Sequence, residues 1–374
     1  MGGTPPIGAP PGPIDVSYSI TPTTIPNEVD SPDFLVPPDL AGLDDAILQT
    51  EMLRNPEFRA EVDDWVTFWT TRASRWFPEY LERMSWFSET VDSVLAAEGL
   101  PPSLRYLPVI ESGYFPGAVS SASAVGLWQF MAPTARGFGL EITPLIDERR
   151  HPFKSTEAAV RYLGQLHDQF DSWFLALAAY NSGPYRVQRL IDRHARLAMP
   201  SDSVYWAIRP HLPKETRDFV PKFFGAMVVA SRPTAHGYEK PEARRFDFDE
   251  VMVPDATSMD VVARAAEAEE AEILRLNPEY VRGMTPPDRH MMVRVPKGQA
   301  RTFRLNYAAI PAAERVSFVE HVVATGETLT HIAIQYGIPL SDLQAANPRV
   351  RPRYLRIGTR LTVPVSPTAR RRAG

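Results

Sequence analysis

The chain has 374 residues, which is too long for one ordinary hydrophobic core and predicts two or three domains. It contains no cysteine, so disulfides and thiolate metal ligands are excluded, and we expect no cofactor and no metal. A net charge of −5 without a stripe of aromatic and basic residues argues against nucleic-acid binding. No apolar run approaches the ~20 residues that span a bilayer, and the first residues lack the pattern of a signal peptide.

The chain begins with a proline-rich segment and ends with a basic one. Ten prolines lie in residues 1–40, and we predict a flexible leader over residues 1–43. Between Leu340 and Gly374 there are eight arginines and one acid, and residues 367–374 are predicted to be a solvated basic tail. The alternative for this tail is contact with an anionic polymer or a membrane surface.

Helical periodicity covers residues 44–240. The first part, up to Gly99, carries aromatic residues at helical spacing, which is typical of core packing. A further short helix is predicted to begin at Pro133, followed by the turn-rich segment ITPLIDERRHPFKS (142–155). Ser155 is predicted to cap the next helix.

Helix-stop signals then precede a last amphipathic helix. Asn181-Ser182-Gly183 is expected to end one helix and Pro184 to begin another. Tyr180 and Asn181 would then lie at a helix end, where side chains can face a cleft. The stretch LPKETRDFVPKFFGAMVVA, from Leu212, predicts one more helix.

Glu111 is the candidate for acid–base chemistry. In the run from Pro101, Leu104, Leu107 and Glu111 recur at steps of three and four, so a helix would place them on one apolar face. Pro108 is expected to kink this helix. Burial raises the pKa of an isolated carboxyl, which a general acid working near neutrality requires. The alternative is that Glu111 caps the helix or forms a salt bridge.

The run after Glu111 is suited to bind sugar. A connection rich in Gly and Ser leads to GLWQFM (126–131), which combines aromatic rings with an amide. Aromatic rings can wall a sugar site and amides hydrogen-bond hydroxyls, so this run indicates a saccharide-cleaving site.

Two segments of the C-terminal third share the plan strand, turn, helix, helix, Asn-Pro, loop, strand. Ser258 corresponds to Thr328 and Asn277-Pro278 to Asn347-Pro348, both pairs seventy residues apart. A constant offset identifies a repeat. We therefore predict two small modules, over residues 246–300 and 318–366.

These motifs together resemble a known family. Residues 100–230 are similar to the catalytic domain of soluble lytic transglycosylases through Glu111-Ser112, GLWQFM, AAYNSG from Ala178 and LPKETRDFVPK. The repeat at 321–365 resembles a LysM module, a family that binds glycans containing N-acetylglucosamine, and the repeat at 251–297 resembles a degenerate copy. The whole layout resembles the membrane-bound lytic murein transglycosylase D family.

The resemblance implies a mainly α multidomain protein, α+β overall. A goose-lysozyme-like helical domain is expected over residues 44–240, with its core at about 100–230, followed by two small βααβ LysM-like modules. The expected partners are peptidoglycan glycan strands. The expected location is the bacterial envelope, in the periplasm, with a monomer anchored to the outer membrane through a targeting segment not present in this chain.

The resemblance also assigns roles to residues. Glu111 would be the single acid and base: it protonates the glycosidic oxygen between N-acetylmuramic acid and N-acetylglucosamine, then takes a proton from the 6-hydroxyl as a 1,6-anhydro ring closes. One carboxyl suffices because the substrate supplies its own nucleophile, whereas ordinary glycosidases need two. Ser120 would help to orient the substrate or the acid. The other positions implied to line the cleft are Ser112, Trp128, Gln129, Met131, Tyr180, Asn181 and Phe219. In the second module, the implied glycan contacts are Gly326, Thr328, Asn347 and Pro348.

One position departs from the family pattern. Many relatives carry a tyrosine, whose hydroxyl reaches towards the acid, where this chain has Phe219. We expect Tyr180, Tyr114 or a water to replace that donor, or the rate to be lower, with activity retained.

Two other functions are compatible with the same residues. The first is a lysozyme-like muramidase, in which water attacks. The second is a wall-binding scaffold with an idle cleft, against which the retained Glu111, Ser120, Gln129 and Asn181 count.

The two modules are expected to have different functions. The first has the acidic, glycine-less turn Asp255-Ala256 where the second has Thr325-Gly326, and is therefore predicted to be a spacer packed on the catalytic domain. The module from His321 is predicted to bind glycan.

Overall fold

The computed structural model describes residues 45–363, apart from 144, 197, 200, 243, 287–288 and 316–318. The predicted leader and basic tail lie outside the described residues. The chain divides into two compact units. The first contains residues up to Gly139 together with Pro152–Arg245, and the second contains Leu140–His151 together with the residues from Phe246. The sequence predicts a continuous helical domain over residues 44–240, whereas the segment Leu140–His151 belongs to the second unit.

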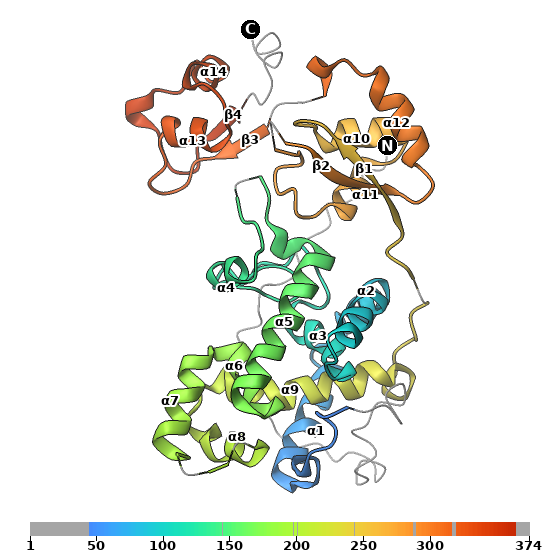
Figure 1. Cartoon of the computed structure of the whole chain (residues 1–374), viewed down its shortest axis with the longest axis vertical. Helices are drawn as coiled ribbons and strands as arrows, with labels where there is room; N and C mark the ends of the chain where they lie inside the picture. The colour runs from blue at the N-terminus through green and yellow to red at the C-terminus, as the bar shows by residue number, and fades with distance from the viewer. Residues whose placement is uncertain are drawn as a thin grey trace. The chain divides into compact units, whose positions relative to one another are not determined.

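The first unit is built from helices (Figure 1). Its elements are η3 (Glu51–Arg54), α1 (Pro56–Thr70), α2 (Phe77–Ala97), η4 (Pro102–Tyr106), α3 (Leu107–Ser112), α4 (Ala132–Gly137), α5 (Pro152–Phe170), α6 (Trp173–Ser182), α7 (Pro184–His194), α8 (Asp202–Ile208), η6 (Arg209–His211), α9 (Lys214–Ser231) and η7 (Pro233–His236).

Helix α6 forms the centre of this unit. Every residue from Trp173 to Ala179 is buried, and α5, α7, α8 and α9 all pack against it. Helix α1 packs on α9, where Gly225 approaches Trp65 so closely that an added Cβ would lie 2.6 Å from the Trp65 Cβ. The aromatic stripe predicted as core is confirmed at Phe68, Trp69 and Phe87, which are buried.

Local signals account for most helix ends. Ser172 caps α6, because its Oγ accepts a hydrogen bond from the Leu175 N–H at 3.2 Å. The predicted stop at Gly183 (φ +90°) and the start at Pro184 are confirmed. Inside α9, Pro221 cannot donate to the Arg217 carbonyl, which instead accepts a hydrogen bond from the Tyr205 hydroxyl at 3.3 Å.

Two predictions at helix starts are wrong. Ser155 is not a cap, since α5 begins at Pro152 and Ser155 lies buried inside it. Proline is favoured in a first helical turn, where its missing N–H costs nothing. For the same reason Pro108 does not kink a helix: a 3-10 turn ends at Tyr106 and α3 begins afresh at Leu107, with Pro108 in its first turn.

The second unit holds the two repeats, each built on a two-stranded antiparallel sheet (Figure 1). Its elements are η5 (Glu148–Arg150), β1 (Phe248–Val253), α10 (Met259–Ala266), α11 (Glu270–Leu276), β2 (Met291–Pro296), α12 (Ala300–Ala309), η8 (Ala312–Glu314), β3 (Val319–Val322), α13 (Leu329–Gln335), α14 (Leu340–Ala346), η9 (Pro352–Tyr354) and β4 (Arg360–Val363). The predicted βααβ plan and the mainly α, α+β class are both confirmed.

The register of each sheet is simple. Phe248 pairs with Pro296 and Val253 with Met291 in the first sheet, and Val322 pairs with Arg360 in the second. Helix α12 packs on α10 and β1, so the first module continues past the predicted boundary at residue 300.

The repeated asparagines tie the second helix of each module to its second strand. The Asn277 amide donates to the carbonyls of Ile273 (2.9 Å) and Arg294 (2.7 Å) and accepts from the Arg294 N–H (2.8 Å). Asn347 makes the same three bonds, to Leu343 and Thr362, at 2.8, 2.6 and 2.8 Å. Within the described part of the chain, no helix combines the length and the apolar content that crossing a membrane requires.

Candidate active site

Glu111 lies at the end of α3, where the chain turns sharply. Gly113 follows it in the left-handed region (φ +59°), and a Cβ there would lie 2.4 Å from the Tyr80 ring. Between them, the Ser112 hydroxyl donates to the Leu127 carbonyl at 2.8 Å. Ser112 therefore joins the acid-bearing helix to the GLWQFM run.

The surroundings of Glu111 favour its protonated form. Its pKa is raised to about 8, chiefly by burial, while the positive charge of Lys222 lowers it and the negative charge of Glu215 raises it. A little of the residue remains accessible to solvent. The structure agrees with the predicted raised pKa, although Glu111 is half-buried and not fully enclosed. The protonated form is the state in which a carboxyl can donate a proton at neutral pH.

Lys222 is a charged neighbour that the sequence reasoning missed. Its Nζ donates to the Ile110 carbonyl at 3.3 Å and lies 5.9 Å and 5.8 Å from the ring centres of Trp65 and Trp69. Burial lowers the pKa of this ammonium, while the Glu111 charge raises it. Lys222 follows Phe219 by three residues on α9, so the spacing within LPKETRDFVPK could have indicated that both share one helix face.

The GLWQFM run forms a compact loop. Val125 bridges to both Val119 and Phe130, and Gln129 adopts φ +49°, with its Nε2 donating to the Gly126 carbonyl at 2.9 Å. Ser120 stabilises the preceding turn, because its hydroxyl accepts from the Ala124 N–H at 2.9 Å.

Two members of the run differ in exposure. Met131 is exposed, as a residue lining a cleft should be. Trp128 is completely buried, and its indole N–H donates to the Thr156 hydroxyl at 2.9 Å. The prediction that Trp128 contacts substrate is therefore corrected: it supports the loop from inside.

Tyr180 and Asn181 connect this loop to α9. The Tyr180 hydroxyl donates to the Trp128 carbonyl at 2.7 Å. The Asn181 Oδ1 accepts from the Thr216 hydroxyl at 2.8 Å, and its Nδ2 lies 3.5 Å from the Glu215 carboxylate. Thr216 and Glu215, in the ETR part of the last motif, are further site residues that the sequence reasoning did not single out.

Three aromatic residues bear on the tyrosine hydroxyl that this chain lacks near the acid. Phe219 is buried, so it contributes packing. Tyr114 is also buried and donates to the Arg105 carbonyl at 2.5 Å, so its proton is already committed. Tyr180 is close enough for the Glu111 charge to raise its pKa, after the larger effect of burial, but its proton goes to Trp128. Among the described residues, Lys222 is the cation whose charge acts on Glu111.

The residues predicted for glycan binding in the second module fall into two groups. Gly326, at φ +84°, is exposed, as are Thr328 and Pro348, and the Thr328 hydroxyl caps α13 by accepting from the His331 N–H at 3.2 Å. Asn347 is buried and its amide atoms are engaged within the module. The structure therefore gives Asn347 a structural position, contrary to the prediction of direct glycan contact.

The chain matches three domain families in sequence. Residues 94–199 match the Transglycosylase SLT domain, residues 247–312 the LysM-like domain of lytic transglycosylase MltD, and residues 321–364 the LysM domain. One part of the chain is therefore similar to SLT domains, and two later parts are similar to the MltD LysM-like domain and to LysM domains.

The chain is also similar in sequence to a complete lytic transglycosylase. Over 288 residues the chain is 30% identical to membrane-bound lytic murein transglycosylase D of Escherichia coli K12, covering 73% of this chain and 62% of that protein. The predicted resemblance to the membrane-bound lytic murein transglycosylase D family is confirmed by these matches. The chain spans less than two thirds of the length of this relative.

Two solved structures are also similar to part of the chain. Lytic transglycosylase Slt of Pseudomonas aeruginosa has 26% identity and a TM-score of 0.32, covering 41% of this chain and 25% of that one. The soluble lytic transglycosylase SLT70 of Escherichia coli has 24% identity and a TM-score of 0.33, covering 40% and 24%.

Proposed function

We propose that the protein is a peptidoglycan lytic transglycosylase acting in cell-wall turnover or remodelling. It cleaves the β-1,4 bond between N-acetylmuramic acid and N-acetylglucosamine without water and leaves 1,6-anhydromuramyl ends. The observation that carries this proposal is the environment of Glu111, a carboxyl held protonated by burial inside a domain that matches the SLT family.

The proposed reaction uses the one carboxyl twice. Glu111 first donates its proton to the glycosidic oxygen, and the bond from that oxygen to the anomeric carbon breaks. The resulting carboxylate then takes the proton of the muramyl 6-hydroxyl while that oxygen bonds to the anomeric carbon, so Glu111 ends protonated again. Lys222 is placed to stabilise the carboxylate between the two steps, because its charge favours the ionised form of Glu111.

The supporting residues hold this acid in place. Ser112 ties α3 to the GLWQFM loop, and Tyr180 ties the same loop to α6. Asn181 joins the end of α6 to the start of α9, which carries Lys222. We propose that Ser120, Gln129, Met131 and Asn181 line the cleft in which the glycan lies.

The decisive test compares the products formed from purified sacculi. Mass spectrometry should find 1,6-anhydro ends, whereas reducing ends would identify a muramidase and intact polymer a scaffold. In Glu111→Gln, the rate should fall by roughly 10²–10⁴-fold, since the amide keeps the shape but transfers no proton. The exposed Glu98 at the end of α2 gives the matched control, Glu98→Gln, which should keep full activity. A Glu111→Gln protein that still released fragments at the normal rate would contradict the mechanism.

We propose peptidoglycan glycan strands as the partner and the bacterial envelope as the location. Support comes from the LysM match over residues 321–364 and from the relative, whose name describes a membrane-bound murein transglycosylase. A periplasmic location, an outer-membrane tether and a monomeric state stay predictions.

A further inference from the structure

The two repeated modules expose the same loops very differently. In the second module, Gly326 and Thr328 of the first loop are exposed, and so is Tyr354 of the second loop, at 74%. Seventy residues earlier, the first module buries the corresponding positions: Ala256, Ser258 and Met284 are 6%, 5% and 0% exposed. These are the two loops between which the second module is expected to bind glycan.

The second loop of the first module is covered by the segment Leu140–His151. Ile146 forms an antiparallel bridge with Tyr280. The Asp147 N–H donates to the Glu279 carbonyl at 2.9 Å, and the Val281 N–H donates to the Leu145 carbonyl at 3.1 Å. The segment thus pairs with the loop through one isolated antiparallel bridge, a short form of the strand addition by which many domains recognise peptides.

Side chains of the segment enter two cores. Ile146 is 1% exposed and belongs to the core of the first module, with Val251, Val293 and Tyr280. Leu145, 4% exposed, packs in a different cluster, with Ala256 and Met284 and with the core of the second module. The segment therefore fills the space beside both loops with apolar side chains.

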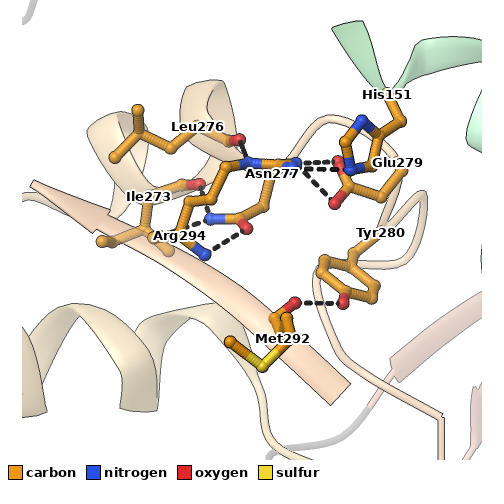
Figure 2. Close-up of polar contacts among 8 residues, drawn as sticks. All are labelled: His151, Ile273, Leu276, Asn277, Glu279, Tyr280, Met292 and Arg294. Carbon is orange, nitrogen blue, oxygen red and sulfur yellow. Dashed lines mark hydrogen bonds and ion pairs between the residues drawn. The ribbon is translucent and has the colours of Figure 1, made fainter. Parts of the chain in front are cut away.

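A buried ionic network holds the end of the segment (Figure 2). The Arg294 and Glu279 side chains are 3% and 6% exposed and pair at 2.5 Å. The same guanidinium donates to the Leu276 carbonyl at 2.6 Å and to Nε2 of His151 at 2.8 Å. Because arginine has only donors, His151 must accept through this nitrogen. A buried ion pair is costly unless its groups are fully bonded, so His151 completes a site that the module has built.

This network is specific to the first module. Glu279 corresponds to Arg349 seventy residues later. Arg294, which donates its N–H to the repeated asparagine, corresponds by the same bond to Thr362. The second module therefore lacks both charges of the pair. At the other end of the segment, Arg289 holds Glu141 through two bonds, of 2.7 and 3.1 Å.

We propose that the LysM-like module is an internal adaptor whose ligand is the segment Leu140–His151 of the same chain, and that its glycan groove is thereby closed. The module holds the piece of chain between α4 and α5, inside the SLT-matching range, in place of a sugar. This inference does not depend on the transglycosylase activity, and its tests measure docking and binding only.

The first test uses the absence of cysteine from the chain. The two hydrogen bonds flanking Ile146 and Tyr280 make them a non-hydrogen-bonded antiparallel pair, whose Cα atoms lie about 4.5 Å apart, within disulfide range. The full-length double variant Ile146→Cys/Tyr280→Cys should therefore form an intramolecular disulfide under mild oxidation, measured by mass spectrometry after proteolysis. Thermal unfolding of the reduced variant checks that it is folded.

A matched control lies within the module. Ser258 and Met284 form an antiparallel bridge flanked in the same way, by bonds from Thr285 to Thr257 and from Met259 to Gly283. Ser258→Cys/Met284→Cys should close equally well. If this control closes while the pair joining the segment to the module stays reduced, the docked segment is disproved.

The second test needs no substitution in the segment. Hydrogen exchange of the full-length protein should show protected Asp147 and Val281 amides, and saturating chitotetraose should leave that protection unchanged. The same oligosaccharide should slow exchange in the loops at residues 324–328 and 349–356. Unprotected Asp147 and Val281 amides, or loss of their protection on adding the sugar, would overturn the proposal.

Discussion

Burial acts on Glu111 and Lys222 in opposite directions. Both groups lose hydration, which raises the pKa of the carboxyl and lowers that of the ammonium. Each charge partly offsets the loss for the other. The pair therefore keeps Glu111 protonated in the resting site and still provides a cation beside the carboxylate once the proton has been transferred.

The pH dependence of the rate follows from the raised pKa. Glu111 must be protonated to act as the acid, and its pKa is about 8, so kcat/KM should fall about tenfold per pH unit above that value. Fragment release from sacculi measured between pH 5 and pH 10 gives the profile. A rate that stays level to pH 10 would contradict the role assigned to the buried acid.

Replacing Lys222 by a neutral residue should shift the alkaline decline of kcat/KM to higher pH. In Lys222→Met the charge that lowers the pKa of Glu111 is lost, so the pKa rises further and the decline shifts to higher pH. At its optimum, kcat should fall by roughly 10²-fold, because the carboxylate formed during the reaction loses its counter-charge.

Two variants on the same helix control for this effect. Lys222→Arg keeps the positive charge, so its pH profile should lie between those of Lys222→Met and the unmodified protein. Lys214, which is exposed and paired with Asp218, gives Lys214→Met as a loss of charge away from the acid, and its profile should be unchanged. If the alkaline decline of kcat/KM in Lys222→Met stays at the same pH, Lys222 does not act on the acid.

At the scale of elements, the repeated asparagine is what joins helix to strand in each module. Asn347→Ala leaves the Thr362 N–H and two carbonyls without partners, so the free energy of unfolding of the second module should fall by about 1–3 kcal/mol. Hydrogen exchange of the β4 amides measures this change. Asn277→Ala should weaken β2 by a similar amount and leave β4 unaffected.

Helix ends were predictable where the signal is local. Gly183 and Pro184 act within one turn of chain, and their positions could be read correctly from the sequence. The start of α5 could not, since both Pro152 and Ser155 are acceptable near a helix start and packing decides between them. The repeat was recognisable because the asparagine at a fixed offset makes the same three bonds in each copy.

The sequence motifs identify most residues of the candidate site, but they do not predict the contacts between these residues. The low exposure and raised pKa of Glu111 agree with the predicted apolar face, but only Leu107 and Glu111 share α3, because Leu104 lies in the preceding 3-10 turn. The influence of Lys222 on it depends on packing between α3 and α9, more than a hundred residues apart. Trp128 illustrates the reverse problem: an aromatic residue in a sugar-binding motif can serve the core, and only its burial shows which role it has.

At the scale of the whole molecule, the chain crosses between its two units three times. It leaves the first unit after Gly139, returns at Pro152 and leaves again after Arg245. A single linker would let the modules be removed without consequence for the rest. Here the segment Leu140–His151 has its partners in the second unit, so deleting the modules exposes Leu145 and Ile146.

This connectivity affects how the predicted glycan binding by the second module can be tested. A chain ending after Arg315 lacks this module and should lose binding to insoluble peptidoglycan, at least tenfold in a pull-down. A chain ending after Pro241 should bind no more weakly than that. Both are made in the Glu111→Gln background, so that the polymer is not degraded during the measurement.

A full-length variant is needed beside the truncations, because removing the second module uncovers Leu145, Ala256 and Met284. Gly326→Val serves this purpose: at φ +84° a branched side chain strains the exposed turn, although no atom lies within 4 Å of an added Cβ. It should weaken binding as the first truncation does, while the free energy of unfolding of the first module stays unchanged. If the chain ending after Arg315 binds as well as the full-length protein and only the shorter one fails, the binding site lies in the first module and the predicted division between the modules is wrong.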